Sequence, residues 1–89
     1  MALAARALRL ALTGKFGFTC EGSGRGPHDK YKLEIDGVWV AHTQLYRGAR
    51  DIDDSLVSAI GRQLGVTRKQ VYDMVECRID RPSYLNLVL

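Results

Sequence analysis

The residues best suited to chemistry lie between Gly22 and His42, where the sequence reads GSGRGPHDKYKLEIDGVWVAH. A glycine-rich loop that carries Arg25 leads directly into His28, and two strand-like runs follow. An imidazole has a reference pKa close to neutrality, so His28 could act as a general acid or a general base. Backbone N–H groups of a glycine-rich loop can surround an anion. The segment therefore predicts a phosphodiester site with His28 at its centre.

Basic residues around this segment extend the predicted site. Besides Arg25, the candidate phosphate contacts are Lys30, Lys32, Arg47 and Arg50. The chain of 89 residues has a formal net charge of +3. Residues 1–50 hold eight Lys or Arg against four Asp or Glu, whereas residues 51–89 hold five against six. Positive charge concentrated beside a candidate acid–base group indicates a polyanionic partner.

Other site chemistries fit the sequence less well. The potential metal ligands lack the close pairs of a zinc site; they are His28, His42, Cys20 and Cys77. The acidic group at residues 51–54 is explained by the start of a helix, where negative charge is favourable. No nucleotide-binding Gly-x-x-x-x-Gly-Lys-Ser/Thr motif occurs. We expect no metal and no cofactor, and His42 would assist His28 only if its strand brought the two together.

Apolar periodicity predicts the elements that hold these residues. A helix is expected over Ala2–Thr13, with an apolar side made of Leu3, Ala7, Leu10 and Ala11. Strands are expected over Phe16–Glu21, over Lys30–Asp36 and from Val38 to Thr43, followed by a loop over Tyr46–Arg50. Asp36-Gly37 is a preferred pair for a two-residue hairpin turn. Regular alternation would place Trp39 on one face with Ala41 and Thr43. Tyr31 and Trp39 could stack on a base, although strand aromatics more often pack in a core.

The C-terminal part predicts helices. Asp53 can cap a helix whose apolar residues include Leu56, Ile60 and Leu64, and Gly65 would end it. Thr67 and Gln70 form a capping box for the next helix, and Pro82–Leu87 would form a short terminal helix. We therefore expect a single α+β domain over residues 1–89: a helix, a three-stranded antiparallel sheet, and two or three helices.

The expected location is the cytoplasm. No apolar run approaches the roughly 20 residues needed to span a bilayer, so no membrane contact is expected. The Arg residues within the first apolar stretch do not fit a secretory signal, and two cysteines in such a chain are expected to be reduced. The acid-free stretch before Glu21 also has the composition of a mitochondrial leader.

Several short sequences occur in the order found in the HicA family of toxin–antitoxin ribonucleases. They are Gly17-Phe18, Gly26-Pro27-His28, Val38-Trp39-Val40 and the run from Ile60 to Gly65. The chain resembles this family up to Thr67, with residues 67–89 as a C-terminal helical extension. The resemblance implies a fold like that of the double-stranded-RNA-binding domain, with helices packed on one face of the sheet. It also implies an antitoxin protein as partner and metal-independent RNA cleavage with His28 as the catalytic residue. Pro27 stands where the family pattern has Ser.

The segment Ile60–Met74, IGRQLGVTRKQVYDM, fits a function of a different class. A glycine in the first helix, a turn at Leu64–Val66 and a capping Thr67 follow the order of a DNA-binding helix-turn-helix. The residues facing the major groove would be Thr67, Arg68, Lys69, Gln70 and Tyr72. Any tight corner between two helices favours a Gly and an N-cap, so the match does not require DNA binding. The excess of positive charge lies in the other half of the chain, and we therefore rank RNA binding above DNA binding. A binding module without catalysis is the third interpretation.

Overall fold

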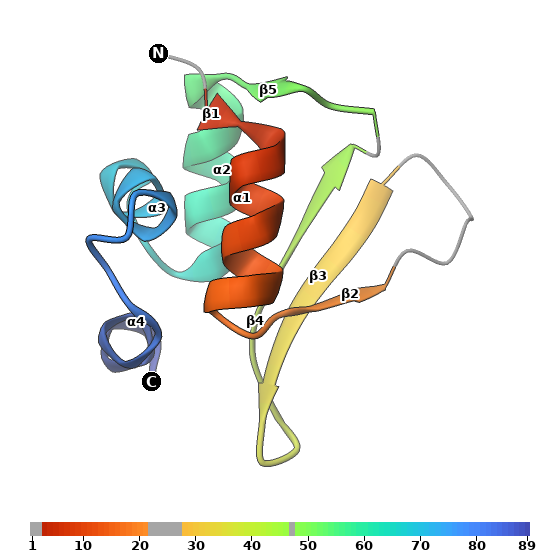
Figure 1. Ribbon diagram of the computed structural model, residues 1–89. Helices are drawn as coiled ribbons and strands as arrows, with labels where there is room; N and C mark the ends of the chain where they lie inside the picture. Colours follow the sequence, from red (N-terminus) through yellow and green to blue (C-terminus); the bar gives the residue numbers. More distant parts are fainter. Residues whose placement is uncertain (1–2, 22–27, 47) are drawn as a thin grey trace.

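The computed structural model describes residues 3–21, 28–46 and 48–89. Along the chain the elements are β1 (Leu3–Ala4), α1 (Ala5–Leu10), the π-helical turn η1 (Ala11–Lys15), β2 (Thr19–Glu21), β3 (His28–Ile35), β4 (Val38–Tyr46), β5 (Asp51–Ile52), α2 (Asp54–Leu64), α3 (Arg68–Val75) and α4 (Arg81–Val88) (Figure 1). The strands β2, β3 and β4 form an antiparallel sheet in that order, and β1 pairs separately with β5. The predicted α+β order of helix, three-stranded sheet and helices is confirmed, with three helices after the sheet.

The N-terminal helix forms, but it begins at Ala5 rather than Ala2, continues as a π-helical turn to Lys15, and buries a different side. The buried residues of this segment are Leu3, Ala5, Leu8, Ala11 and Leu12. Leu10 is 62% exposed and Ala7 is only half-buried, so the predicted apolar side was wrong for both. The reason is that Leu3 is extended in β1, where it pairs with Ile52. The helical spacing of apolar residues therefore does not start at Leu3. The unforeseen pairing of β1 with β5 is a tertiary contact between segments far apart in the sequence.

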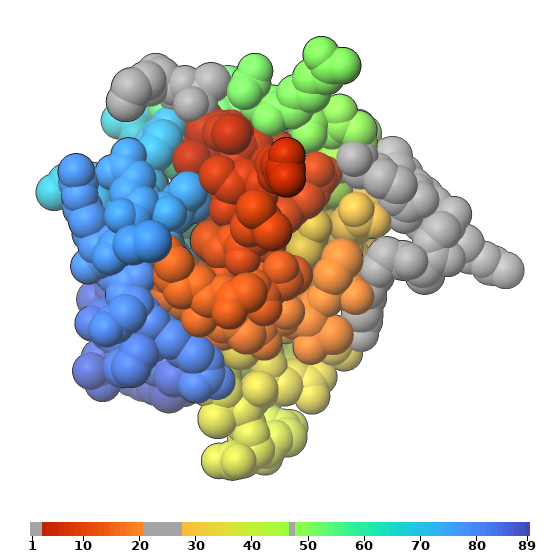
Figure 2. All heavy atoms as spheres, in the orientation of Figure 1, coloured from red at the N-terminus to blue at the C-terminus, as the bar shows by residue number. Residues whose placement is uncertain are grey.

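The turn between β3 and β4 forms as predicted. Asp36 and Gly37 have φ angles of 53° and 80°, both positive, as a type I′ turn requires. In the space-filling view this turn projects from the lower edge of the molecule (Figure 2). The same view shows α1 between the C-terminal helices on one side and the strands on the other.

A β-bulge lies close to this turn. Glu34 pairs with Trp39, whereas the preceding residue of β3 pairs with Ala41, so Val40 has no partner. An extra residue in one strand reverses the alternation of the side chains beyond it. Trp39 consequently lies beside His42, and it is 57% exposed. The expected grouping of Trp39 with Ala41 was therefore wrong, because the alternation is broken at Val40.

Capping residues fix the ends of the C-terminal helices. The Asp53 carboxylate accepts a hydrogen bond from the Leu56 N–H at 2.8 Å, and Thr67 and Gln70 form the predicted capping box. Gly65 ends α2 with a φ of 84°, a left-handed conformation that favours glycine. The final helix α4 begins with a proline in its first turn, as predicted.

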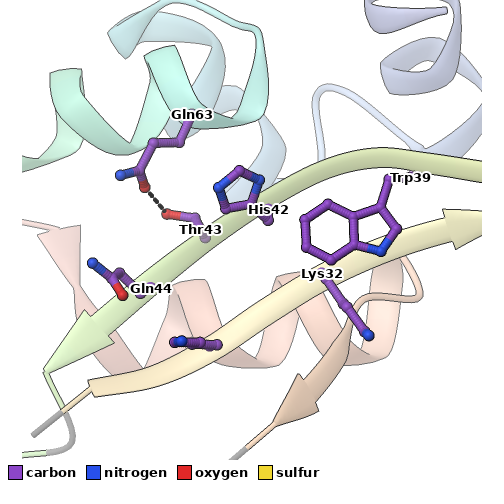
Figure 3. Close-up of a pocket in the computed structure, with 7 residues that line it drawn as sticks. Lys32, Trp39, His42, Thr43, Gln44 and Gln63 are labelled. Carbon is purple, nitrogen blue, oxygen red and sulfur yellow. Dashed lines mark hydrogen bonds between the residues drawn. The ribbon is translucent and has the colours of Figure 1, made fainter. Parts of the chain in front are cut away.

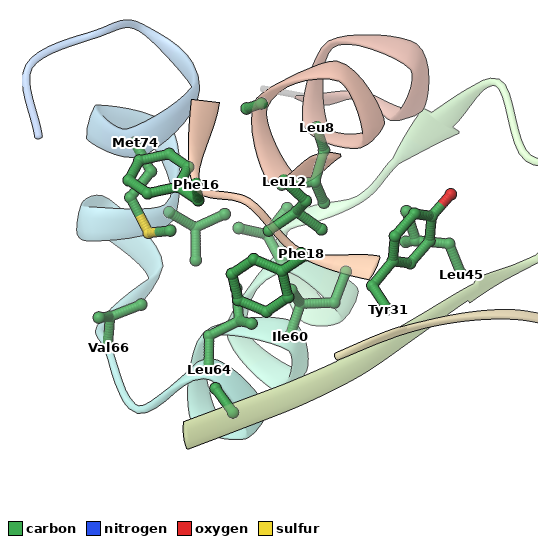
Figure 4. Packing of buried hydrophobic residues seen from close by; sticks show 14 of the residues in the cluster. Leu8, Leu12, Phe16, Phe18, Tyr31, Leu45, Ile60, Leu64, Val66 and Met74 are labelled. Atoms are coloured by element: carbon green, nitrogen blue, oxygen red, sulfur yellow. The ribbon is translucent and has the colours of Figure 1, made fainter. Parts of the chain in front are cut away.

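Aromatic residues join the last helix to the rest of the core. The Phe16 and Phe18 rings lie 5.6 Å and 6.2 Å from the buried Tyr84 ring of α4. The Tyr84 hydroxyl donates a hydrogen bond to the Leu64 carbonyl at 2.8 Å, and burial raises the pKa of Tyr84 to about 12. Figure 4 shows other buried apolar side chains of the core, from α1, η1, the sheet, α2 and α3, among them Leu8, Leu12, Leu45, Ile60 and Met74.

Two further expectations concern the membrane and the cysteines. Within the described ranges, no helix has the length and apolar character needed to cross a bilayer. Cys20 and Cys77 are both free and exposed, as expected of thiols that form no disulfide.

Candidate nucleic-acid interface

The three-stranded sheet has one buried face and one exposed face. Alternate residues of β3 and β4 belong to the core, namely Tyr31, Leu33, Ala41, Thr43 and Leu45. The other side, here called the outer face, carries His28, Lys30, Lys32, Glu34, Trp39, His42, Gln44 and Tyr46, all fully or partly exposed. In the strand register, the paired residues on this face are His28 with Tyr46, Lys30 with Gln44, and Lys32 with His42.

One end of the outer face is built around His28. Its ring lies 4.3 Å from the Tyr46 ring, with an angle of 41° between the two planes. The Arg9 guanidinium of α1 donates a hydrogen bond to the Tyr46 carbonyl, which ties the end of β4 to the helix. A cavity of about 140 Å³ lies beside the imidazole, bordered on the far side by Leu56 and Ala59 of α2. His28 is half-buried, so its ring is held by packing and still borders open space.

The other end is a cluster of four side chains around Trp39. The Trp39 Nε1–H donates to Glu34 Oε1 at 2.9 Å, and Lys32 Nζ lies 3.3 Å from the same oxygen. Lys32 Nζ is also 5.5 Å from the Trp39 ring centroid, within the range of a cation–π contact. The His42 ring lies 5.4 Å from the Trp39 ring. These contacts hold an aromatic pair and an ammonium group together at the surface.

A larger cavity, of about 310 Å³, lies between this cluster and α2 (Figure 3). Gln63 of α2 borders it, and the buried Thr43 hydroxyl donates to Gln63 Oε1 at 2.6 Å. Gln44 and Gln63 border both this cavity and the smaller one beside His28. The two cavities therefore adjoin along β4, and we call them together the outer groove.

Three of the five predicted phosphate contacts, Lys30, Lys32 and Arg50, lie within the described residues. Lys30 and Lys32 share the outer face with His28, as predicted. Arg50 is exposed in the connection before β5, where its carbonyl accepts a hydrogen bond from the Ala5 N–H at 2.8 Å. Arg25, Arg47 and the glycine-rich loop at residues 22–27 lie outside the described residues.

His42 does not join His28. The β3 partner of His42 is Lys32, four positions along the strand from His28. At about 3.3 Å per residue, this separation is about 13 Å. The two imidazoles therefore cannot act as an acid–base pair on one phosphate, and each belongs to its own ring pair on the outer face.

Three groove residues had no role in the sequence prediction. The sequence indicates a loop at Tyr46, and it gives no binding role to Gln44 or Gln63. Continued alternation of exposed residues from His42 through Gln44 to Tyr46 was the available signal for the two strand residues. Gln63 had no such signal, because its place in the groove depends on how α2 lies along β4.

The α2–α3 corner has the predicted helix-turn-helix order, and four of the five residues expected to face the major groove contact other corner residues, while Lys69 is exposed. Thr67 and Gln70 are engaged in the capping box. The Tyr72 hydroxyl donates to Asp54 at 2.7 Å, and Arg68 lies 3.9 Å from the same carboxylate. The hydrogen bond from Tyr72 lowers the pKa of Asp54, and the same bond raises the pKa of Tyr72.

Packing explains the small residue in this corner. A Cβ atom on Gly61 would lie 2.8 Å from the Val66 carbonyl oxygen, closer than such contacts allow. The Gly61 carbonyl in turn accepts a hydrogen bond from the Val66 N–H at 2.8 Å. A glycine at this position is therefore a requirement of the turn, whatever the corner binds.

The described part of the chain contains no group of three or more His, Cys, Asp or Glu side chains placed to hold a metal ion. Comparison with protein-family models, with curated proteins and with solved structures finds no match to this chain. Function must therefore follow from the site itself.

Proposed function

We propose that this protein binds single-stranded RNA along the outer groove. The observation that carries the proposal is the presence of two ring pairs, His28–Tyr46 and Trp39–His42, on one sheet face, with a lysine between them and another beside Trp39. Protein modules that bind single-stranded RNA stack unpaired bases on rings of an open sheet. Because the pairs are about 13 Å apart along β3, they would receive bases of different nucleotides.

The lysines supply the electrostatic part of the binding. Lys30 lies between the two ring pairs on β3 and borders the larger cavity. Lys32 also borders it while contacting Glu34 and Trp39. Ammonium groups at these positions would contact the phosphates that connect the stacked bases, and this contribution weakens as salt is raised.

The second part of the proposal is metal-independent cleavage of the bound RNA. Transesterification needs a base near the 2′-hydroxyl and donors for the charged phosphorane. His28 is the general acid–base, and Lys30, about 7 Å along the strand, is a cation on the same face. This part also rests on the resemblance to HicA ribonucleases and their double-stranded-RNA-binding-type fold. In that setting an antitoxin protein would cover the basic outer face, in the cytoplasm.

The test compares the two histidines of the outer face. Purified wild type, His28→Ala and His42→Ala are incubated with a mixed-sequence RNA in the presence of a chelator, and cleavage rates are measured. His28→Ala should lower the rate at least about a hundredfold. His42→Ala should keep most of the rate and bind the RNA more weakly. Equal cleavage by wild type and His28→Ala would contradict the catalytic part.

Binding is tested separately, by fluorescence anisotropy with a single-stranded RNA and the corresponding duplex at one salt concentration. The exposed rings predict tighter binding of the single strand, because only unpaired bases can stack on them. Tighter binding of the duplex would contradict the proposed mode of recognition.

A further inference from the structure

The larger cavity of the outer groove offers an unusual excess of hydrogen-bond donors. Building on the proposed RNA binding, we infer that this cavity is a base pocket that selects guanine over adenine. The inference depends on the buried contact between Thr43 and Gln63 and on the two lysines at the rim.

The contact with Thr43 engages the oxygen end of the Gln63 amide. A glutamine amide offers both an acceptor oxygen and two donor hydrogens, and it can ordinarily turn either end toward a ligand. Here Oε1 accepts the Thr43 hydroxyl at 2.6 Å, and Thr43 is only 1% exposed. The labelled side chains in Figure 3 show the oxygen turned toward Thr43 and the nitrogen turned away from it. The two N–H donors of Gln63 are thus not used by Thr43, while Oε1 keeps one further lone pair.

The lysines add donors only, since an ammonium group has no acceptor. Lys30 and Lys32 both border the cavity. Gln44 and His42 also border it and can each supply a donor or an acceptor. The groups that can only donate are thus the two lysines of β3, and Gln63 of α2 adds an amide nitrogen that is turned away from Thr43.

This pattern matches one purine edge better than the other. Guanine presents two adjacent acceptors, N7 and O6, on the edge where adenine presents the acceptor N7 beside the N6 amino donor. The glutamine contact typical for adenine uses the amide oxygen as acceptor, and Thr43 already takes one of the two lone pairs of Gln63 Oε1. The Trp39 and His42 rings provide the apolar surface on which the base would stack.

The test uses short oligouridines with a single central guanine or a single central adenine. Fluorescence anisotropy at one salt concentration gives the affinity of each for wild type. The guanine RNA should bind about tenfold more tightly. Equal affinity for the two RNAs would overturn the base pocket and leave RNA binding intact, whereas no binding of either would overturn both proposals.

Two variants test the cause of the preference. Thr43→Val keeps the shape of the side chain but frees the Gln63 amide to turn, so the preference should fall while oligouridine binding is retained. Gln63→Glu, at an exposed position, replaces the donors with a carboxylate and should abolish the preference even if Thr43→Val fails to fold. Ser55→Ala, on an exposed position of α2, is the matched control and should keep the preference. A preference that survives Gln63→Glu would overturn the inference.

Discussion

The outer face of the sheet and the α2–α3 corner both carry the residue types of a nucleic-acid interface, but they use them differently. On the outer face, Trp39 is 57% exposed and its ring borders a cavity. At the corner, the hydroxyl of Tyr72 donates to Asp54, and Arg68 lies beside the same carboxylate. The difference lies in the rings: Trp39 is exposed on the outer face, whereas Tyr72 at the corner is half-buried and its hydroxyl joins α3 to α2.

The difference shows that residue type alone does not distinguish a binding surface from a structural corner. The corner matches a DNA-binding motif because a tight turn needs Gly61 and a capping Thr67 for packing and hydrogen bonding. The outer face has no comparable motif, and its rings come together through strand register. We therefore expect substitutions on the outer face to change RNA binding, and substitutions at the corner to change stability.

The largest expected effect is on RNA affinity, from Trp39→Ala. Removing the exposed indole eliminates a stacking surface, which is worth roughly 1–3 kcal/mol per base. The dissociation constant for single-stranded RNA, measured by anisotropy, should rise by about tenfold or more. The midpoint of thermal unfolding should change little, because the ring is on the surface. Unchanged affinity in Trp39→Ala would remove the distinction between the two regions.

The next effect is on stability, from Gly61→Ala at the corner. The added Cβ would lie 2.8 Å from a backbone oxygen of Val66, which cannot move aside as a side chain can. The free energy of unfolding should fall by about 2 kcal/mol, despite the better helix propensity of alanine. Denaturant titration measures this change. RNA affinity of the folded fraction should stay at the wild-type value, and a parallel loss of affinity would place the corner in the interface.

A smaller effect concerns Tyr84, which supports the end of α2 through its bond to Leu64. The folded-state pKa of about 12 lies above the ordinary 10.0, so the stability from this phenol is complete below pH 10.0 and is lost as pH rises toward 12. Tyr84→Phe should cost about 1 kcal/mol at neutral pH. It should also show a shallower loss of stability above pH 10, as measured by denaturant titrations across that range. An identical alkaline profile in both proteins would contradict this assignment.

The smallest effect is expected from Arg68→Ala, although Arg68 would face the major groove in a DNA-binding interpretation. Its contact with Asp54 is exposed, and exposed ion pairs contribute little to stability. Both the unfolding midpoint and the affinity for single-stranded RNA should stay within experimental error of wild type. A marked loss of affinity for duplex DNA in this variant would instead support the helix-turn-helix interpretation.

Elements whose structure depends on a few neighbouring residues could be predicted from the sequence. Asp36-Gly37 encodes its turn through backbone conformation, and Thr67-Gln70 encodes a helix start through two hydrogen bonds, so both could be predicted. The β1–β5 pairing could not be predicted, because two-residue strands exist only through their tertiary contact.

The candidate site divides in the same way. Placing Lys30 and Lys32 on one strand face with His28 required only alternation. Placing Trp39 required knowledge of the bulge at Val40, which depends on the pairing of two strands. The side of the sheet that Trp39 occupies, and with it the Trp39–His42 ring pair of the proposed site, could therefore not be predicted from the sequence.

The most direct test of the central claim is a titration of the isotopically labelled protein with single-stranded RNA, followed by NMR chemical shifts. The outer groove predicts that the Trp39 indole N–H and the backbone signals of Lys30, His42 and Gln44 shift together as RNA is added. Signals of α3 should stay in place. Shifts concentrated on Arg68–Glu76, with β3 and β4 unchanged, would contradict the assignment of RNA binding to the sheet.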